Sequence, residues 1–172
     1  TIAKLVAKKL GFIYVDTGAM YRAMAVHFLR NGISAEETEK IENACDGVSV
    51  SIRYENNEQQ VILNGKNITQ LLRTEEVGKM ASASSVVPKV RMKLVELQRQ
   101  LAATSDVVMD GRDIGTYVLP DAQVKIYMTA GIRERALRRF EELRQKGIEC
   151  NLEEIEKDIA ERDYRDMKRD FA

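Results

Sequence analysis

The sequence has few of the residues that serve metal, disulfide or nucleophilic chemistry. Its 172 residues include two cysteines, one histidine and no tryptophan. Cys45 and Cys150 are too few for a disulfide framework and lack the spacing of metal ligands, which favours a reduced, cytoplasmic setting. No catalytic partner is evident for His27, so we interpret it as an ordinary helix residue. No metal-ligating side chain is assigned.

The sequence also lacks an excess of charge of one sign and a long apolar run. Its 27 basic and 27 acidic side chains cancel, so no overall field would attract nucleic acid or a membrane surface. No apolar run approaches the roughly 20 residues that a membrane-spanning helix needs, and no signal peptide is visible. We therefore expect a cytoplasmic protein without nucleic-acid or membrane partners, and nothing in the sequence demands more than a monomer.

Strands alternate with helices along most of the chain, which predicts an α/β fold with a parallel sheet. Apolar runs at 12–15, 107–109 and 124–128 predict the strands of that sheet. Alternating side chains from Val48 onward, two turns and a return strand predict a small antiparallel insertion over 48–72. Helical spacing predicts helices over 2–10, 18–29, 34–45, from about 74, and over 89–103, 132–146 and 152–162.

Two of the predicted strands end in loops that suit an anionic ligand. Residues 16–22 (DTGAMYR) follow the first strand, and residues 110–116 (DGRDIGT) follow the second. Ligands of an open α/β sheet bind at the carboxyl ends of its strands. Arg22 and Arg112 can each hold a phosphate with two hydrogen bonds. Either loop alone is also compatible with an ordinary strand-to-helix turn that carries a surface ion pair.

These two loops, with Tyr14 and Val15 before the first, resemble the signature stretches of the bacterial cytidylate kinases, which are nucleoside monophosphate kinases. Further stretches are similar in the family's order, namely 81–82, 88–91, 134–139 and 161–166. The resemblance spans essentially the whole chain. It implies a three-layer P-loop kinase fold in which 1–172 form a single domain. Within that domain, 48–72 would be a small β lobe beside the monophosphate and 131–169 an Arg-rich helical lid with the helix that follows.

The resemblance implies ATP-dependent phosphorylation of CMP and dCMP to CDP and dCDP, with Mg²⁺ bridging the ATP phosphates. Such transfer depends mostly on positioning and electrostatic stabilisation, and it needs no general base because the acceptor is already a phosphate oxygen. One alternative is another small P-loop kinase, acting on adenylate, uridylate or shikimate, which would lack the set Ser82, Arg91 and Asp113. The other is a nucleotide-binding module that has lost catalysis.

The resemblance also implies roles for individual residues. The residues expected to bind CMP are Thr17, Tyr21, Arg22, Ser82, Arg91, Arg112, Asp113, Arg162, Asp166 and Arg169. The residues expected on the ATP side are Thr1, Arg138 and Arg139, and those expected to stabilise the transferred phosphoryl group are Arg112, Arg139, Arg162 and Arg169. Among the CMP-binding residues, Ser82, Arg91 and Asp113 would read the cytosine.

Structural roles remain possible for these charged residues. Arg162, Asp166 and Arg169 are an exception, because their spacing of i, i+4 and i+7 puts them on one face if the helix persists, which suits contact with a phosphate and a sugar. Most of the arginines at 133–139 would lie on a solvated face, and Asp113 would merely pair with a neighbouring arginine.

One motif of the resembled family is absent. The sequence contains no G-x-x-x-x-G-K-[ST] phosphate loop. Residues 1–10 instead resemble the helix that follows that loop, and 169–172 resemble a point at which the family continues into a last strand and helix. We therefore expect a chain trimmed at both ends and inactive by itself, in which the phosphate-binding lysine and the Mg²⁺ ligand cannot be named.

Overall fold

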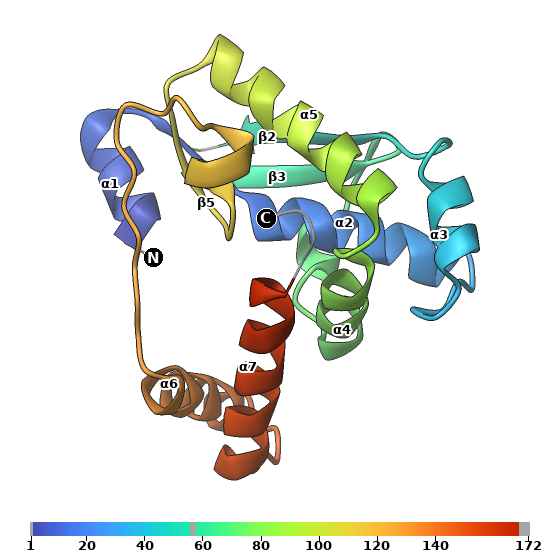
Figure 1. Ribbon diagram of the computed structural model, residues 1–172, viewed down its shortest axis with the longest axis vertical. Helices are drawn as coiled ribbons and strands as arrows, with labels where there is room; N and C mark the ends of the chain where they lie inside the picture. Colours follow the sequence, from blue (N-terminus) through green and yellow to red (C-terminus); the bar gives the residue numbers. More distant parts are fainter. Residues whose placement is uncertain (1, 56–57, 169–172) are drawn as a thin grey trace. The chain divides into compact units, whose positions relative to one another are not determined.

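The computed structural model describes residues 2–55 and 58–168, and the chain divides into two compact units, Thr1–Pro120 and Asp121–Ala172 (Figure 1). A parallel sheet, a small antiparallel sheet and several helices make up the α/β fold, which is consistent with the P-loop kinase fold that the sequence predicts. Thr1 and Arg169, expected to contact ATP and CMP, lie outside the described residues.

The parallel sheet of the first unit pairs β1 (Ile13–Asp16) with β5 (Val107–Asp110). Both strands agree with their predicted positions to within one residue. The register places Asp16 opposite Asp110, so the two strands end level with each other. Because the strands are parallel, the loops that follow them start side by side at one edge of the sheet.

The helices of the first unit lie close to their predicted positions. They are α1 (Ile2–Leu10), α2 (Thr17–Arg30), α3 (Thr38–Ala44), α4 (Glu75–Ser84) and α5 (Pro88–Thr104), with the short turns η1 (Thr69–Leu71) and η2 (Ile114–Val118). The prediction of a helix from residue 34 is wrong by four residues: Glu37 accepts a hydrogen bond from the Ser34 N–H at 2.9 Å, but the helix starts only after it. Proline at the first position of α5 costs no hydrogen bond there.

Helix α2 is the centre of the first unit's core. It starts at Thr17 because the Asp16 carboxylate accepts a hydrogen bond from the Ala19 N–H at 3.0 Å and caps the helix. Its buried side chains include Met20 and Met24, and the helix lies against α4 and α5 as well as the antiparallel sheet. The position of α2 relative to both sheets is therefore set by apolar packing as well as by its cap.

The antiparallel sheet has the order β2 (Val50–Glu55), β3 (Glu58–Leu63), β4 (Lys66–Asn67). Asn64 and Gly65 form the turn between β3 and β4 with φ of 48° and 79°, a conformation that asparagine and glycine adopt most readily. The small antiparallel sheet expected in this part of the chain is therefore present. Its buried residues Val50, Val61 and Leu63 belong to the same core as α2.

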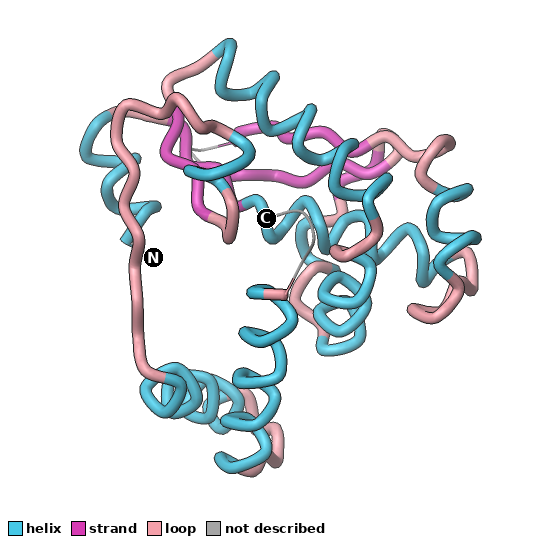
Figure 2. Tube along the Cα trace, viewed as in Figure 1, coloured by secondary structure: helices cyan, strands magenta, loops and turns pink. Residues whose placement is uncertain are grey.

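The apolar segment 124–128 forms no strand, so that prediction is wrong. Residues 119–131 contain neither helix nor strand, and Figure 2 draws them as loop. Val124, Ile126 and Tyr127 are 76%, 77% and 91% exposed. Apolar alternation shows which residues would suit a sheet, but a strand exists only when a neighbour takes up its backbone hydrogen bonds. No such neighbour occurs among the residues that the structure describes.

The second unit contains the helices α6 (Ile132–Gln145) and α7 (Leu152–Met167), as predicted, with α7 five residues longer than expected. The Asn151 side chain caps α7 by accepting hydrogen bonds from the N–H groups of Glu153 and Glu154, at 2.8 and 3.2 Å. Ala136 is the one fully buried hydrophobic residue in the described part of this unit. Because so little apolar surface is buried in this unit, polar contacts contribute much of the interaction between α6 and α7.

Candidate functional site

The ends of β1 and β5 are tied together by a hydroxyl group. Thr17, 4% exposed, donates from Oγ1 to the carbonyl oxygen of Asp110 at 2.7 Å. Gly111 follows at once, and a Cβ atom there would lie 2.6 Å from Thr17 Oγ1 and 2.8 Å from the Ile114 side chain. Only glycine therefore fits beside the hydroxyl without displacing it. The close approach fixes the path of the loop that carries Arg112.

Two carboxyl groups and a tyrosine make up a second contact between these strands. The Tyr14 hydroxyl donates to Asp110 Oδ2 at 3.0 Å. Burial, and after it the nearby charge of Asp16, raises the pKa of Asp110 above its usual value. Burial also raises the pKa of Tyr14, so its hydroxyl remains a donor. Tyr14 and Asp110 lie within the two motifs, but sequence reasoning assigned neither a role because their contact spans 96 residues of chain.

Arg22 lies on the first turns of α2, at the end of the sheet where β1 stops. Its Nη1 atom is 3.4 Å from the point where a Cβ of Gly18 would stand, so the guanidinium covers the start of the helix. No hydrogen bond or ion pair engages Arg22 within residues 2–55 and 58–168. Tyr21 is half-buried against the core. The Arg22 guanidinium therefore lies beside the end of β1 with its donors unengaged by other described residues.

Arg91 and Asp113 form a buried ion pair. The Arg91 Nη2 atom lies 2.5 Å from Asp113 Oδ2, and the two side chains are 5% and 14% exposed. The Nε–H of Arg91 is also buried and has no hydrogen-bond partner among the described atoms. An unsatisfied buried donor is costly, and one in a ligand site is explained if the ligand supplies the acceptor. The pair thus presents a spare donor close to a carboxylate.

Ser82 and Arg112 complete the residues predicted in the first unit. Ser82 is half-buried on α4, and its carbonyl oxygen accepts a hydrogen bond from the Ser85 hydroxyl at 2.8 Å. No hydrogen bond joins Ser82 to Arg91 or Asp113 in the part of the chain that is described. Arg112 is exposed in the loop after β5. The structure thus brings Arg91 directly to Asp113 and leaves the Ser82 hydroxyl outside that contact.

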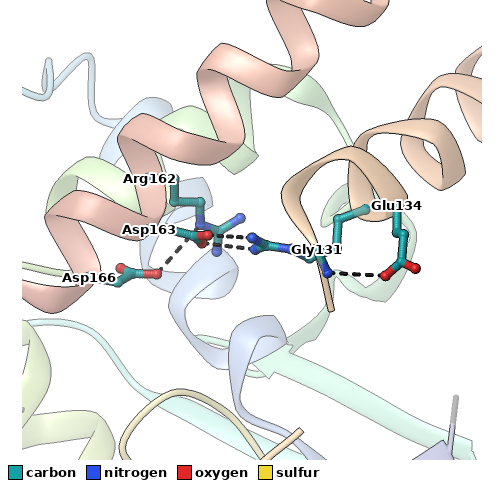
Figure 3. A network of polar contacts seen from close by, with 6 residues as sticks. Gly131, Glu134, Arg162, Asp163 and Asp166 are labelled. Carbon is teal, nitrogen blue, oxygen red and sulfur yellow. Dashed lines mark hydrogen bonds and ion pairs between the residues drawn. The ribbon is translucent and has the colours of Figure 1, made fainter. Parts of the chain in front are cut away.

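The predicted residues on α7 form part of a polar network in the second unit (Figure 3). Arg162 Nε lies 4.0 Å from Asp166 Oδ2, one helical turn away, so the two share the predicted face. Beside them, Asp163 receives two hydrogen bonds from the Arg135 guanidinium of α6, at 2.9 and 2.5 Å. This contact joins α6 to α7 next to Arg162. Sequence reasoning missed it, and charge patterning on two separate helices could not have indicated the pairing.

The two arginines predicted to face ATP lie on α6 and are exposed. Arg138 donates weakly from Nε to the Glu134 carbonyl oxygen at 3.5 Å, and Arg139 forms an ion pair with Glu142 at 3.2 Å. Both contacts are local to α6 and accessible to solvent, so they compete little with a bound anion. The described residues contain no group of three histidine, cysteine, aspartate or glutamate side chains that could hold a metal ion.

The first unit therefore carries basic and acidic side chains at and near the ends of β1 and β5. Arg22 has guanidinium donors that no protein group engages within the described residues, and Arg91 with Asp113 forms an ion pair that is largely protected from water. None of the helices in the described part of the chain is long and apolar enough to cross a membrane.

Comparison with known proteins covers the whole chain. A family model described as "Cytidylate kinase" matches residues 1–172. Curated proteins with the same name are similar to it throughout. That of Caldicellulosiruptor saccharolyticus is 47% identical over 172 residues, which are 100% of this chain and 76% of the relative. Those of Ligilactobacillus salivarius and Streptococcus sanguinis are each 47% identical over 172 and 173 residues, covering 100% of this chain and 77% of the relative.

Proposed function

The chain belongs to the cytidylate kinase family, and we propose that it supplies the acceptor site for the family's reaction, in which the terminal phosphoryl group of ATP is transferred to CMP or dCMP to give CDP or dCDP and ADP. It is a nucleoside monophosphate kinase by family. The observation that supports cytosine as the base is the buried pair of Arg91 and Asp113, in which Arg91 engages Asp113 Oδ2 and leaves Oδ1 for a ligand.

The acceptor phosphate would be held at the strand ends by Arg22 and Arg112. A guanidinium can bind two phosphate oxygens at once, which fixes the direction from which the acceptor oxygen attacks. Arg22 is free of protein partners among the described residues, and Arg112 is exposed beside Gly111. Thr17 would lie between them, with a hydroxyl oxygen that can accept a hydrogen bond while it donates to Asp110. No proton acceptor is required, because a phosphate oxygen is the nucleophile.

The cytosine would be read by Arg91 and Asp113. Cytosine offers N3 and O2 as acceptors and its N4 amino group as a donor, so a carboxylate beside a guanidinium matches its edge. Asp113 uses Oδ2 for Arg91, which leaves Oδ1 for the amino group. Ser82 would act from α4 as a further donor. Uracil carries a carbonyl where cytosine carries the amino group, and that oxygen would face the carboxylate without a proton between them.

The second unit would supply the positive charge that neutralises the transferred phosphoryl group. Arg162 and Asp166 share one face of α7, and the matching position Arg169 lies outside the described residues. Arg138 and Arg139 on α6 would contact ATP. A helical segment that closes over both nucleotides excludes water, which limits hydrolysis of ATP and strengthens each charge contact. These residues support the prediction that the range 131–169 acts as a lid.

ATP would bind as its Mg²⁺ complex, and the ion would offset part of the negative charge of the phosphates. No group of three acidic side chains is available for it in the described residues, so no ligand of the ion is assigned to this chain. Cys45 and Cys150 are both free thiols, which supports the proposed cytoplasmic location. The proposed working unit is a monomer.

The experiment compares CMP and UMP as acceptors in the full-length protein and in its Asp113→Asn variant. The wild type should form CDP with a clear preference for CMP. A hydrogen bond to a charged group is worth about 1.5–3 kcal/mol, so the asparagine variant should lose roughly 10- to 100-fold of that preference. Asp46→Asn is the matched control, because Asp46 pairs with Lys89 at 2.8 Å on the exposed side of α5.

Three outcomes separate the alternatives. A wild type that makes no CDP overturns the proposed reaction, and one that prefers UMP supports a uridylate kinase instead. If the preference is the same in the Asp113→Asn variant as in the wild type, Asp113 serves only to pair with Arg91. Circular dichroism of both variants establishes that the comparison is made on folded protein.

A further inference from the structure

The outer edge of β1 is covered by side chains in place of a strand. Within the described part of the chain, β1 pairs with β5 on one side only, and an edge strand leaves alternate N–H and C=O groups without strand partners. Here the Tyr54 hydroxyl donates to the carbonyl oxygen of Tyr14 at 3.2 Å. The Gln59 amide accepts from the Asp16 N–H at 2.8 Å and donates to the Asp16 carbonyl oxygen at 3.2 Å. One side-chain amide thus supplies the donor and the acceptor that a neighbouring strand would supply.

Both covering side chains come from the antiparallel sheet. Tyr54 on β2 and Gln59 on β3 are directly opposite each other in the register, so their side chains share one face of the hairpin. Burial raises the pKa of Tyr54 to about 12, which keeps its hydroxyl protonated and able to donate. The hairpin is therefore attached to β1 through two neighbouring positions, and the attachment is made to backbone atoms.

Asp16, the residue that Gln59 contacts, lies at the junction between β1 and α2. It is the last residue of β1, it caps α2 through its carboxylate, and it precedes Thr17. Its backbone sets the direction in which α2 leaves the sheet, and α2 carries Arg22. A shift of Asp16 would move the Thr17 hydroxyl and the Arg22 guanidinium together. Small displacements of groups that orient a reacting phosphate lower the rate strongly.

We propose that Gln59 is a positioning residue for the acceptor site, and that its amide holds the Asp16 backbone so that Thr17 keeps its bond to Asp110 and Arg22 faces the acceptor phosphate. Tyr54 supports the same edge of β1 two residues earlier, at Tyr14. Gln59 itself does not contact the substrate. The inference rests on the proposed function for the role of the site, whereas the contact between Gln59 and Asp16 stands independently of it.

The test replaces Gln59 by methionine in the full-length protein, which keeps the length of the side chain and removes its hydrogen bonds. Gln60→Met is the matched control, because Gln60 lies next along β3 and its amide accepts instead from Asn67 at 3.0 Å. The KM for CMP should rise about fivefold or more in the Gln59 variant while the KM for ATP stays near its wild-type value. A purely structural role would move both constants or neither.

A second measurement reads the contact directly. Hydrogen exchange of the Asp16 amide, followed by NMR, should be roughly tenfold faster in Gln59→Met than in the control, as expected for one lost hydrogen bond. Unchanged exchange would show that Gln59 does not hold this backbone. Faster exchange with an unchanged KM for CMP would refute the positioning role. A wild type without CMP kinase activity would overturn the proposed function, and the exchange result would still decide the contact.

Discussion

Replacing Gly111 by alanine tests the closeness of the two strand ends. The added Cβ would lie 2.6 Å from Thr17 Oγ1 and 2.8 Å from Cγ1 and Cδ1 of Ile114. The isoleucine side chain can rotate, but the threonine hydroxyl is buried and already bound to the Asp110 carbonyl oxygen at 2.7 Å. Losing that bond costs about 1 kcal/mol and the overpacking about 1–3 kcal/mol. We expect Gly111→Ala to lower the free energy of unfolding by about 2–4 kcal/mol.

Gly78→Ala provides a control in which the same chemical change should have the opposite sign. Gly78 lies inside α4, and a Cβ there would meet no atom within 4 Å. Alanine favours the helical backbone over glycine by roughly 0.5–1 kcal/mol, so this variant should be more stable than the wild type. The contrast separates a local steric conflict at Gly111 from any general effect of replacing glycine.

Urea denaturation followed by circular dichroism measures both variants. A third variant, Gly111→Ala combined with Thr17→Ala, removes the hydroxyl that the new Cβ would strike. The double variant should lose less stability than the sum of the two single losses, by about 1 kcal/mol or more. Without the Thr17 hydroxyl, the new Cβ at position 111 no longer has that group to collide with. A Gly111→Ala protein as stable as the wild type, or strictly additive losses, would contradict the close approach of these strand ends.

Two further predictions concern charged groups. A double-mutant cycle on Arg135 and Asp163 should give a coupling energy of about 1–2 kcal/mol, because the contact is bidentate and only partly exposed. The coupling energy is measured by hydrogen exchange of the α6 and α7 amides, and a value near zero would contradict a stabilising contact between the two side chains. The pKa of Asp110 is raised in the folded protein by burial and by Asp16, so its contribution to stability is present below about pH 4 and is lost as the pH rises through the raised value. As the pH is raised from about 4 to 7, the free energy of unfolding measured by urea titration should therefore fall less for Asp110→Asn than for the wild type. If the free energy of unfolding depends on pH in the same way in both proteins, the pKa of Asp110 is not raised.

Local features of the sequence were enough to place most helices and strands, including the carboxyl ends of β1 and β5. The strands before Asp16 and Asp110 follow from short apolar runs, and the start of α2 follows from an aspartate that can cap it. The turn at Asn64 and Gly65 follows from the backbone conformation that these residue types adopt. Each of these signals depends on side chains a few residues apart. The arrangement of parallel strands then brings both motifs to one edge of the sheet.

Contacts between distant residues were decided only by the tertiary structure. The Tyr14 hydroxyl meets Asp110 across 96 positions, Gln59 holds Asp16 across 43, and Arg91 meets Asp113 across 22. Each partner has several other groups of suitable chemistry along the chain, and local spacing does not choose among them.

The segment 124–128 shows that a local pattern can also predict a strand that does not form. Its alternating apolar side chains suit a strand, yet its backbone has no strand partner within the described residues and remains in a loop. The sequence by itself therefore determined which segments can be helices and strands and which side chains end them. The tertiary structure decided which segments pair, because the hydrogen bonds of a strand are completed by a neighbour whose position depends on the packing of the remaining chain.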